Sequence, residues 1–574
     1  MSDRVRPVSV RSDARVLNHW DLLAVLLVLG GLVFVAEASR GLTQPLASLD
    51  AAPTSLDPMR LPGYAARTTL RMLAAMVLSL LFTVTYATWA ARSRRAELVL
   101  VPLLDILQSV PVLGFISVTV VFFMALAPGR VLGAEFAAVF AIFTSQAWNM
   151  AFSFYQSLRT VPAELVEASQ CFRFSAWMRF WRIEVPFAMP ALVWNMMMSM
   201  SGGWFFVVAA EAISVGTTTV TLPGIGSYIA LAINRRDLAA VGWAIGAMLV
   251  VILVYDQLLF RPLVAWADRF RFEQELGVAP PRSWVLTALR RSALIATLSG
   301  PMAAVWRLSY RRRPPRAAPV DSGDRWLAWL DRIWAATVLV LAALALWRIA
   351  VFILAGVSPS EVASAVGSAT VTMLRVLVLI ALASVVWVPI GVRVGLSPRL
   401  ARLVQPAAQF LAAFPANLLF PVAVSAIVAL RLNPDIWLSP LMILGTQWYI
   451  LFNVIAGASA LPSELRDVST NLRVGGWLWW RKVALPGVFP YYVTGAITAS
   501  GGSWNASIVA EVASWGDHRL EAHGLGAYIA RATEAADYHR IVLGIAVMSL
   551  FVVIINRALW RPLYWRAERK FRLG

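Results

Sequence analysis

The chain has 574 residues, of which 59% are hydrophobic and only 14% are charged, and its mean hydropathy is +0.69. A soluble domain could not bury so much apolar surface in one core, so the composition indicates a polytopic membrane protein. One cysteine and four histidines exclude a disulfide framework and make a metal cluster improbable. The net charge of +19 is almost all arginine in short loops. That pattern orients membrane helices, and we expect no nucleic-acid partner.

Apolar runs close to the roughly 20 residues that cross a bilayer recur along the chain. The clearest are Leu22–Ala38, Leu70–Ala90, Phe136–Phe154, Ala239–Phe260, Trp334–Ala355, Val371–Val392 and Ile541–Ile555. The first follows a basic N-terminus without a convincing cleavage site, so we predict a retained helix. A cytoplasmic N-terminus places nearly all arginine-rich loops inside. We therefore predict an all-α polytopic membrane protein with about twelve membrane helices and both termini cytoplasmic.

An internal repeat organises the chain. Matching residues 300 positions apart include Trp148 and Trp448, Pro162 and Pro462, Glu211 and Glu511, Gly224 and Gly524, and Asp237 and Asp537. Upstream the offset is 304, as between Pro102 and Pro406. Each half should hold six spans in the same orientation, so we predict parallel repeats related by a pseudo-twofold axis along the membrane normal. The first repeat is predicted at residues 1–272 (core 68–270) and the second at residues 325–574 (core 369–571).

Residues 273–324, between the repeats, are rich in arginine and contain Pro280-Pro281 and Pro314-Pro315. The simpler interpretation is a basic cytoplasmic linker. The alternative is that Ser283–Tyr310 lies along the inner membrane surface, with its arginines facing anionic lipid.

Each repeat has a long polar loop between its fourth and fifth predicted spans, at Thr160–Pro190 and Ala460–Pro490. Each loop opens with a proline two residues before a glutamate, Glu164 or Glu464. This pattern favours a helix start, because the carboxylate lies at the positive end of the helix dipole. A short protruding helix of this kind suits docking into a groove of another protein. The alternative is a solvated amphipathic loop, and the duplication favours docking.

These loops resemble the "EAA" signature of permease subunits from binding-protein-dependent ABC importers. The matching residues are Glu167, Ala168, Ser169 and Pro186 in the first copy, and Asp467, Ser469 and Pro486 in the second. Arg173 and Arg473 replace the glycine of the signature, and the matched change indicates a matched groove on the partner. The downstream Gly-x-Gly-x-Tyr motif is similar to that of the nitrate/sulfonate/taurine branch, and the fused double form is similar to duplicated anion-transport permeases.

The resemblance implies a type I ABC importer-like fold in a bacterial inner membrane. It also implies two copies of an ABC ATPase docked at the loops, an external substrate-binding protein, and a small anion as substrate: nitrate, a sulfonate, bicarbonate or similar. A phosphate-binding loop needs Gly-Lys-Ser/Thr. Neither lysine of the chain, Lys482 or Lys570, stands in that context. We therefore predict no enzyme activity and no bound cofactor, with ATP and Mg on the partner subunits.

An anion pathway should offer neutral donors that replace hydration. The predicted pathway residues are Gln108, Ser201, Trp204, Ser500, Ser503, Trp504 and Asn505. Asn505 stands where the first repeat has Phe205, so we predict an asymmetric site weighted to the second repeat. Close helix packing by small residues is the alternative for these stretches. Glu211 and Glu511 either pair at helix ends or contact substrate.

The sequence leaves two alternative functions to compare with the ABC permease. An ion-coupled secondary transporter would need titratable pairs or broken helices deep in the bilayer. Few such groups are visible, and both cytoplasmic loops would be unexplained. A membrane scaffold that transports nothing would not require a twofold pathway. The sequence favours the ABC permease over both.

Overall fold

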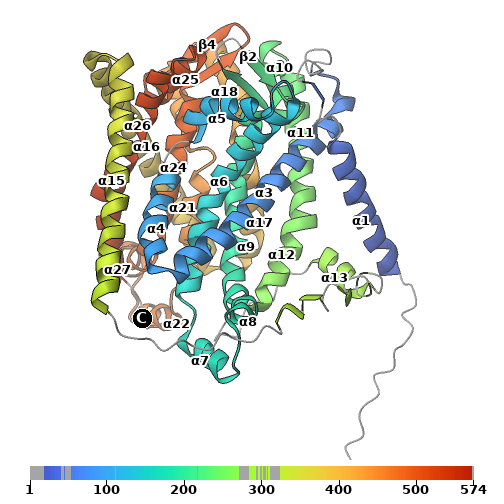
Figure 1. Cartoon of the computed structure of the whole chain (residues 1–574), viewed down its shortest axis with the longest axis vertical. Helices are drawn as coiled ribbons and strands as arrows, with labels where there is room; N and C mark the ends of the chain where they lie inside the picture. Colours follow the sequence, from blue (N-terminus) through green and yellow to red (C-terminus); the bar gives the residue numbers. More distant parts are fainter. Residues whose placement is uncertain are drawn as a thin grey trace, which may run out of the picture. The chain divides into compact units, whose positions relative to one another are not determined.

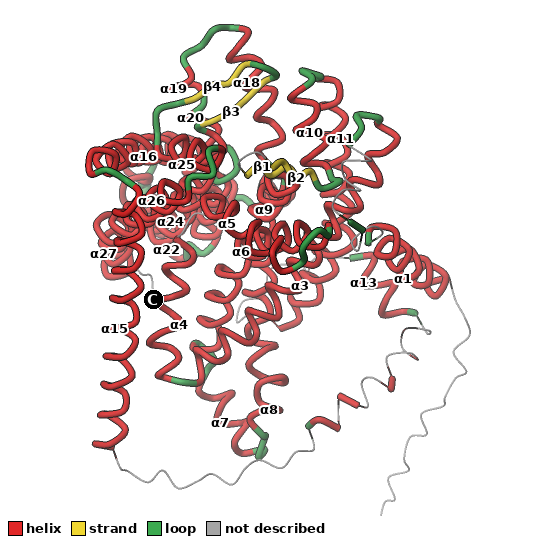
Figure 2. Tube along the Cα trace, turned by 45° about the horizontal axis from the view of Figure 1, so that its top comes forward, coloured by secondary structure: helices red, strands yellow, loops and turns green. Residues whose placement is uncertain are grey.

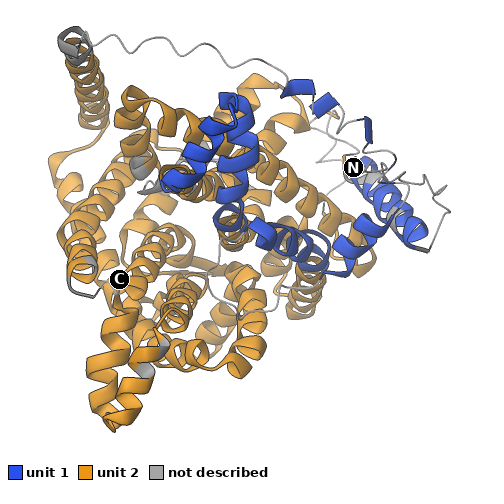
Figure 3. Cartoon of the chain, turned by 90° about the horizontal axis from the view of Figure 1, so that it is seen from below, with its two compact units in different colours: residues 1–38, 160–193, 254–320 blue, residues 39–159, 194–253, 321–574 orange. Residues whose placement is uncertain are grey.

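The computed structural model describes residues 19–39, 44–45, 54–109, 112–215, 218–270, 283–292, 295, 297, 300–301, 305–306, 308–310 and 324–571. The described residues form helices and, apart from loops, two short β-hairpins (Figure 2). The chain divides into two units (Figure 3). Unit 1 comprises residues 1–38, 160–193 and 254–320, and unit 2 comprises residues 39–159, 194–253 and 321–574. The repeat boundaries at 272 and 324 adjoin undescribed residues and stay a prediction.

Unit 1 contains the N-terminal helix, the first polar loop and the segment that follows the first repeat. Its elements are α1 (His19–Ala38), α7 (Ala163–Cys171), α8 (Ala176–Arg179), the π-helical turns η2 (Phe180–Glu184) and η3 (Asp256–Phe260), α12 (Arg261–Ala267), η4 (Asp268–Phe270) and α13 (Trp284–Arg291). Helix α1 is tied to the end of α13, because Ser292 Oγ donates to Asp21 Oδ1 at 2.7 Å. Helices α9 (Val185–Glu211) and α11 (Leu238–Tyr255) belong partly to each unit.

Unit 2 contains most of the long helices (Figure 1). From the first repeat it takes η1 (Pro58–Arg60), α3 (Leu61–Arg92), α4 (Arg94–Ser109), α5 (Val112–Leu126), α6 (Val131–Arg159), β1 (Ala212–Val215), β2 (Thr218–Thr221) and α10 (Ile225–Asn234). From the second repeat it takes α15 (Asp324–Gly356), α16 (Pro359–Leu396), α17 (Pro398–Ala413), η5 (Ala416–Leu419), α18 (Phe420–Ala429), α19 (Pro434–Trp437), α20 (Ser439–Ile443), α21 (Gln447–Ser459), α22 (Ser463–Asn471), α23 (Gly476–Trp479), η6 (Trp480–Ala484), α24 (Leu485–Ala510), β3 (Val512–Trp515), β4 (His518–Glu521), α25 (Leu525–Glu534), α26 (Tyr538–Ile555), η7 (Asn556–Trp560) and α27 (Arg561–Phe571).

The predicted duplication is visible element by element. The elements that begin 300 residues apart are α7 and α22, α8 and α23, η2 and η6, α9 and α24, β1 and β3, β2 and β4, α10 and α25, α11 and α26, η3 and η7, and α12 and α27. Upstream, α4 and α17 are offset by 304 residues at both ends. Helix α3 packs on α6, and α16 packs on α21 in the same way. The chain is therefore built from two copies of one helical arrangement.

The predicted apolar runs all lie in helices. Seven helices of the described residues are long and apolar enough to cross a membrane, and two bent pairs raise that number to nine. The bent pairs are Pro398–Ala413 with Ala416–Ala429, at 77°, and Pro434–Ile443 with Gln447–Ser459, at 43°. Helix α1 is a shorter apolar helix, and the junction between α4 and α5 lies outside the described residues. The fold is therefore that of a polytopic α-helical membrane protein, and the total of twelve stays a prediction.

Two β-hairpins interrupt the helical pattern at matching places. Strand β1 pairs antiparallel with β2, and β3 pairs antiparallel with β4. Both hairpins lie at one end of the unit 2 helices, and α22 and α27 lie at the other end (Figure 1). The second hairpin is tied to the first repeat, because Gly516 N donates to Ile233 O at 3.0 Å and Arg236 pairs with Asp517 at 2.5 Å. The sequence prediction missed these strands, although Gly516-Asp517 is a typical hairpin turn.

A buried arginine joins three segments of the first repeat within unit 2. Arg71 of α3 binds both carboxylate oxygens of Glu135 at 2.6 Å and donates to Glu211 Oε1 at 2.7 Å. Thr68 Oγ1 and the Gly226 amide also donate to Glu211, at 2.7 Å each. The side chains of Arg71 and Glu211 are 3% and 0% exposed. The network gives Arg71, Glu135 and Glu211 hydrogen-bonded partners, and it ties α6 and the end of α9 to α3.

The second repeat contains the same network at matching positions. Arg375 of α16 donates to Asp435 at 2.8 Å and to Glu511 at 3.4 Å, and Thr372 Oγ1 donates to Glu511 at 2.8 Å. The Ala527 amide donates to Glu511 at 3.1 Å. This copy is more open, because the Arg375 and Asp435 side chains are 12% and 37% exposed. Glu211 and Glu511 are thus paired structurally, which is the helix-end alternative of the sequence analysis.

The networks explain the repeated Gly-x-Gly motif. A Cβ at Gly224 or Gly524 would collide with the carboxylate of Glu211 or Glu511. A Cβ at Gly226 would collide with the carbonyl of Val208. Only glycine lets the backbone approach the carboxylate closely enough for an amide to donate to it.

Replacing Arg71 by alanine should destabilise the protein more than replacing Arg375, although both substitutions remove the same group. Arg71→Ala strands two carboxylates in a closed site, which costs about 3–5 kcal/mol. The more open second site lets water reach Asp435. Thermal denaturation followed by size-exclusion chromatography in detergent compares the two variants, with Arg67→Ala as the control for loss of charge on the same helix. Equal losses from Arg71→Ala and Arg67→Ala would contradict the role given to the network.

Candidate functional site

Unit 2 encloses a cavity of about 810 Å³. Its walls come from α6 and α9 of the first repeat and from α20, α21 and α24 of the second. The bend at Phe414 and Ala416 also contributes, and the residues from Val552 to Tyr564 line one end of the cavity. No charged side chain lines it among the residues that the structure describes. The cavity therefore lies where both repeats meet.

The lining uses equivalent positions of the two repeats, but with different side chains. On α9 and α24 the aligned pairs are Trp194 and Thr494, Met198 and Thr498, Phe205 and Asn505, and Phe206 and Ala506. On α6 and the α20–α21 segment they are Ser145 and Gly445, Asn149 and Tyr449, Ser153 and Asn453, and Gln156 and Ala456. At these positions α9 thus carries mainly aromatic side chains where α24 carries threonines, an asparagine and an alanine, although Asn195 and Ser199 of α9 also line the cavity. Polar lining comes from both repeats and is not confined to the second.

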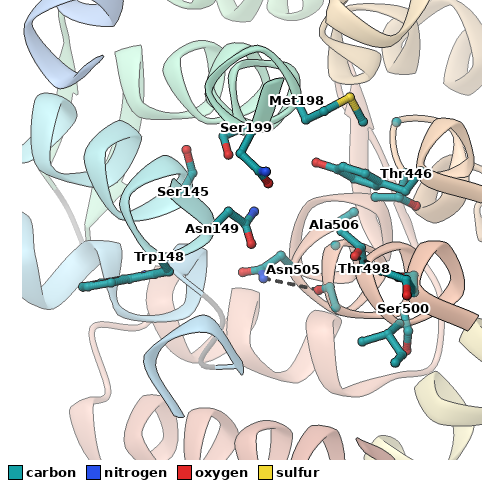
Figure 4. Close-up of a pocket in the computed structure, with 18 of the residues that line it drawn as sticks. Ser145, Trp148, Asn149, Met198, Ser199, Thr446, Thr498, Ser500, Asn505 and Ala506 are labelled. Carbon is teal, nitrogen blue, oxygen red and sulfur yellow. Dashed lines mark hydrogen bonds between the residues drawn. The ribbon is translucent and has the colours of Figure 1, made fainter. Parts of the chain in front are cut away.

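Neutral hydrogen-bonding groups point into the cavity. Asn149 and Asn505 lie on facing helices and point toward the same part of it (Figure 4). Asn505 Nδ2 donates to Gly501 O at 3.4 Å. Ser199 and Trp560 also line the cavity, and Ser199 Oγ and Trp560 Nε1 are buried without a hydrogen-bond partner among the described residues. Buried donors without partners are uncommon in folded proteins.

The structure separates the predicted pathway residues into four groups. Ser500 and Asn505 line the cavity. Ser503 is buried behind it, where its hydroxyl bonds to that of Thr446 at 2.9 Å, and Thr446 does line the cavity. Trp204 and Trp504 are each 1% exposed and lie outside the lining. The side chains of Gln108 and Ser201 lie outside the described part of the chain. A pathway role for these residues stays a prediction.

The predicted docking helices form in both repeats, as α7 and α22. Each begins just after a proline and has its glutamate, Glu164 or Glu464, in the first turn. Glu164, Glu167 and Ala168 are exposed in the first repeat, and Glu464 and Asp467 are exposed in the second. Ser169 and Ser469 are buried, and Pro186 and Pro486 are half-buried near the starts of α9 and α24. Each helix therefore presents its acidic side chains to solvent.

Apolar side chains accompany these acidic groups. Phe172 is 75% exposed at the end of α7. Val468 and Leu472 are 51% and 70% exposed on and beside α22. Exposed apolar groups beside acidic ones are typical of a surface that binds another protein.

Arg173 and Arg473 have a backbone conformation that explains why the signature has glycine there. Their φ angles are both 51°, in the left-handed region. The Phe174 amide donates to Ser169 O at 2.9 Å, and the Val474 amide donates to Ser469 O at 2.8 Å. These bonds end α7 and α22 in the Schellman manner, which glycine favours. An arginine in this conformation costs about 1–2 kcal/mol, so both repeats keep a strained cation beside the acidic helix.

A family comparison agrees with this arrangement. The family described as "Binding-protein-dependent transport system inner membrane component" matches residues 79–263 and again residues 387–559, which together are more than half of the chain. The chain belongs to this family. The predicted family is thereby confirmed, including its occurrence twice in one polypeptide. Members are membrane components of transport systems.

Curated relatives of this inner membrane component include three permeases. The bicarbonate transport system permease protein CmpB of Synechococcus elongatus is 28% identical over 176 residues, or 31% of this chain and 60% of CmpB. The glycine betaine/carnitine transport permease protein GbuB of Listeria monocytogenes is 26% identical over 189 residues, or 33% of this chain and 61% of GbuB. The nitrate import permease protein NrtB of Leptolyngbya laminosa is 25% identical over 182 residues, or 32% of this chain and 62% of NrtB. The matches thus span about three fifths of these relatives' lengths.

The sequence analysis did not identify several residues of the ion networks and of the cavity. Arg71, Glu135, Arg375 and Asp435 are charged residues within or beside apolar segments, and their repeat offsets of 304 and 300 could have revealed them. Asn149, Asn195 and Asn453 line the cavity without a motif that marks them. Helical wheels do not show which face of a membrane helix meets a cavity when every face is apolar enough for lipid.

Cysteine substitution tests the cavity directly, because Cys171 is the only cysteine of the sequence. In a Cys171→Ser background, Thr498→Cys should react with a small water-soluble methanethiosulfonate at least about tenfold faster than Ser507→Cys, because only exposed thiols react readily. Thr498 lines the cavity, whereas Ser507, two and a half turns along the same helix, is 0% exposed and does not. Equal reaction rates would show that the cavity is closed to water in the protein.

Proposed function

We propose that this chain is the membrane-spanning permease subunit of an ATP-driven ABC importer for a small anion. The observation that carries the proposal is that two family-matching repeats enclose one uncharged cavity, and each presents an acidic docking helix. One polypeptide therefore supplies both halves of the transport pathway.

The energy comes from separate subunits in this proposal. The sequence has no Gly-Lys-Ser/Thr phosphate-binding loop. Two copies of an ABC ATPase dock at α7 and α22, and they hold the ATP and Mg. Closure of the ATPase dimer moves both helices and switches the cavity between opposite sides of the membrane, as in alternating access. An external substrate-binding protein delivers the anion.

The cavity supports a substrate bound by neutral donors. The side chains of Asn149, Asn505 and Thr498 line the cavity and carry groups that can donate hydrogen bonds to oxyanion oxygens. No positively charged side chain among the described residues lines the cavity, so none would retain the anion. The aromatic wall formed by Trp194, Phe205 and Phe206 suits an apolar body. Among nitrate, sulfonates and bicarbonate, this lining favours a sulfonate. The names of CmpB, GbuB and NrtB show that related permeases serve small ions of several kinds.

The arginine distribution supports the sidedness of the proposal. The loops that hold α7, α22 and the C-terminal helix α27 carry the arginine-rich segments, so they face the cytoplasm. The two hairpins then face outward, together with the ion pair between Arg236 and Asp517. Both termini are cytoplasmic, and the membrane is the bacterial inner membrane.

Uptake into proteoliposomes tests the proposal. Vesicles that contain this chain with the ATPase and the substrate-binding protein encoded nearest to it are supplied with ATP and with radiolabelled butanesulfonate, nitrate or bicarbonate. Uptake should require ATP, stop with vanadate and persist with a protonophore. Uptake that stops with the protonophore but not with vanadate would instead identify an ion-coupled transporter, and absence of any uptake would favour a scaffold.

Substitutions at Asn505 test the anion. Asn505→Ala removes a donor and should raise the KM for uptake about tenfold, the usual effect of losing a hydrogen bond to a charged group. Asn505→Asp keeps the shape but adds a negative charge, so it should impair uptake more than Asn505→Ala does. Equal effects, or unchanged uptake in Asn505→Ala with uptake lost in Trp204→Phe, would contradict the assignment.

A further inference from the structure

The segment between the repeats packs on the base of the first docking loop, within unit 1. Trp306 packs edge-to-face on Trp181 and at a tilt against Trp177, with ring centroids 5.1 and 6.2 Å apart. Trp177 Nε1 donates to Ser309 Oγ at 3.1 Å. The guanidinium of Arg182 lies over the ring of Tyr310, 5.0 Å from its centroid. Residues 177–182 of α8 and η2 are thereby held by Trp306, Ser309 and Tyr310 of the linker.

These contacts are specific and not a loose apolar association. Aromatic pairs and a cation–π pair at these distances add electrostatic attraction to the burial of apolar area. The indole nitrogens of Trp177 and Trp306 are both satisfied, since Trp306 Nε1 donates to Tyr310 Oη at 2.5 Å. These two hydrogen bonds fix the orientation of the Trp177 and Trp306 rings, whereas Trp181 Nε1 is buried without a partner among the described residues.

The second repeat does not offer the same surface. Arg481 replaces Trp181 and Lys482 replaces Arg182. Trp477 is 74% exposed, whereas its counterpart Trp177 is 43% exposed. The pair of indole rings, Trp177 and Trp181, that contacts Trp306 therefore occurs only in the first docking loop.

We propose that Trp306, Ser309 and Tyr310 of the linker form a clamp that holds the first docking loop in place and makes the two ATPase docking sites unequal. This inference rests on the proposed function of α7 and α22. The clamp lies at α8 and η2 and leaves the acidic side chains Glu164 and Glu167 of α7 exposed. A loop ordered in advance loses less conformational entropy when its partner docks. The first site is therefore the tight, permanent one, and the second is the weaker site.

A four-variant comparison of ATPase binding tests the clamp. Asp467→Arg leaves only the first docking site, and Glu167→Arg leaves only the second. The Asp467→Arg chain should bind the ATPase subunit about tenfold more tightly than the Glu167→Arg chain, as measured by microscale thermophoresis in nanodiscs. Adding Trp306→Ala with Tyr310→Ala should weaken the first site to the level of the second and leave the second unchanged.

Trp284→Ala is the matched control, because Trp284 is an exposed linker tryptophan outside the clamp. It should change neither affinity. Equal affinities of the two sites, or an equal effect of the clamp variant on both, would overturn the proposal.

A second measurement tests, without any ATPase, whether the clamp immobilises the first docking loop. Cys171 is exposed at the end of α7, and Asn471 is its counterpart on α22. A spin label on Cys171 should be less mobile than one on Asn471→Cys in a Cys171→Ser background. Trp306→Ala with Tyr310→Ala should raise the first mobility only. If no ATPase binds while this result is obtained, the proposed function fails and the clamp stands; if the two labels are equally mobile, the clamp fails.

Discussion

A full charge in the low-dielectric interior of a membrane protein persists only when it is paired and hydrogen-bonded. In this chain that constraint applies at equivalent positions of the two repeats. Arg71 with Glu211, and Arg375 with Glu511, tie the long helices α3 and α16 to the ends of α9 and α24. Glu211 also accepts from the Gly226 amide, and Glu511 accepts from the amide of Ala527, directly after the second Gly-x-Gly motif. The carboxylates lie so close to Gly224 and Gly524 that neither position admits a side chain. The networks thus fix the ends of α9 and α24, two helices that line the cavity.

Two copies of one scaffold have diverged where they meet ligands and partners. The cavity faces Phe205 on one side and Asn505 on the other. The ion network is closed around Arg71 and more open around Arg375. Trp306 of the linker packs on Trp177 and Trp181 of the first docking loop, and the second loop has Arg481 where the first has Trp181. Fusion in a single chain allows such differences, because each position is encoded separately in each half, whereas two identical subunits would share every substitution.

Hydropathy and the repeat offset were enough to predict the apolar helices, the duplication, and α7 and α22, because these features depend on residues close in sequence. The contacts of Arg71 with Glu135 and Glu211 span 64 and 140 residues, and neither period nor spacing indicates them. The hairpins were missed because strand signals of four residues are weak beside long apolar runs. Trp204 and Trp504 were predicted near the pathway because they follow the small residues of α9 and α24, and both are buried outside the cavity lining. The basic composition of the linker did not indicate that Trp306 packs on Trp181.

The central claim is that one chain provides two docking sites for ATPase subunits, and the stoichiometry of the purified complex tests it most directly. The chain is captured from detergent extracts with the ATPase encoded nearest to it, and the mass of the complex is measured by native mass spectrometry. The account predicts two ATPase copies on the unmodified chain and none on the Glu167→Arg plus Asp467→Arg chain. A complex that keeps its ATPase in the double variant, or an unmodified chain that never retains one, would contradict it.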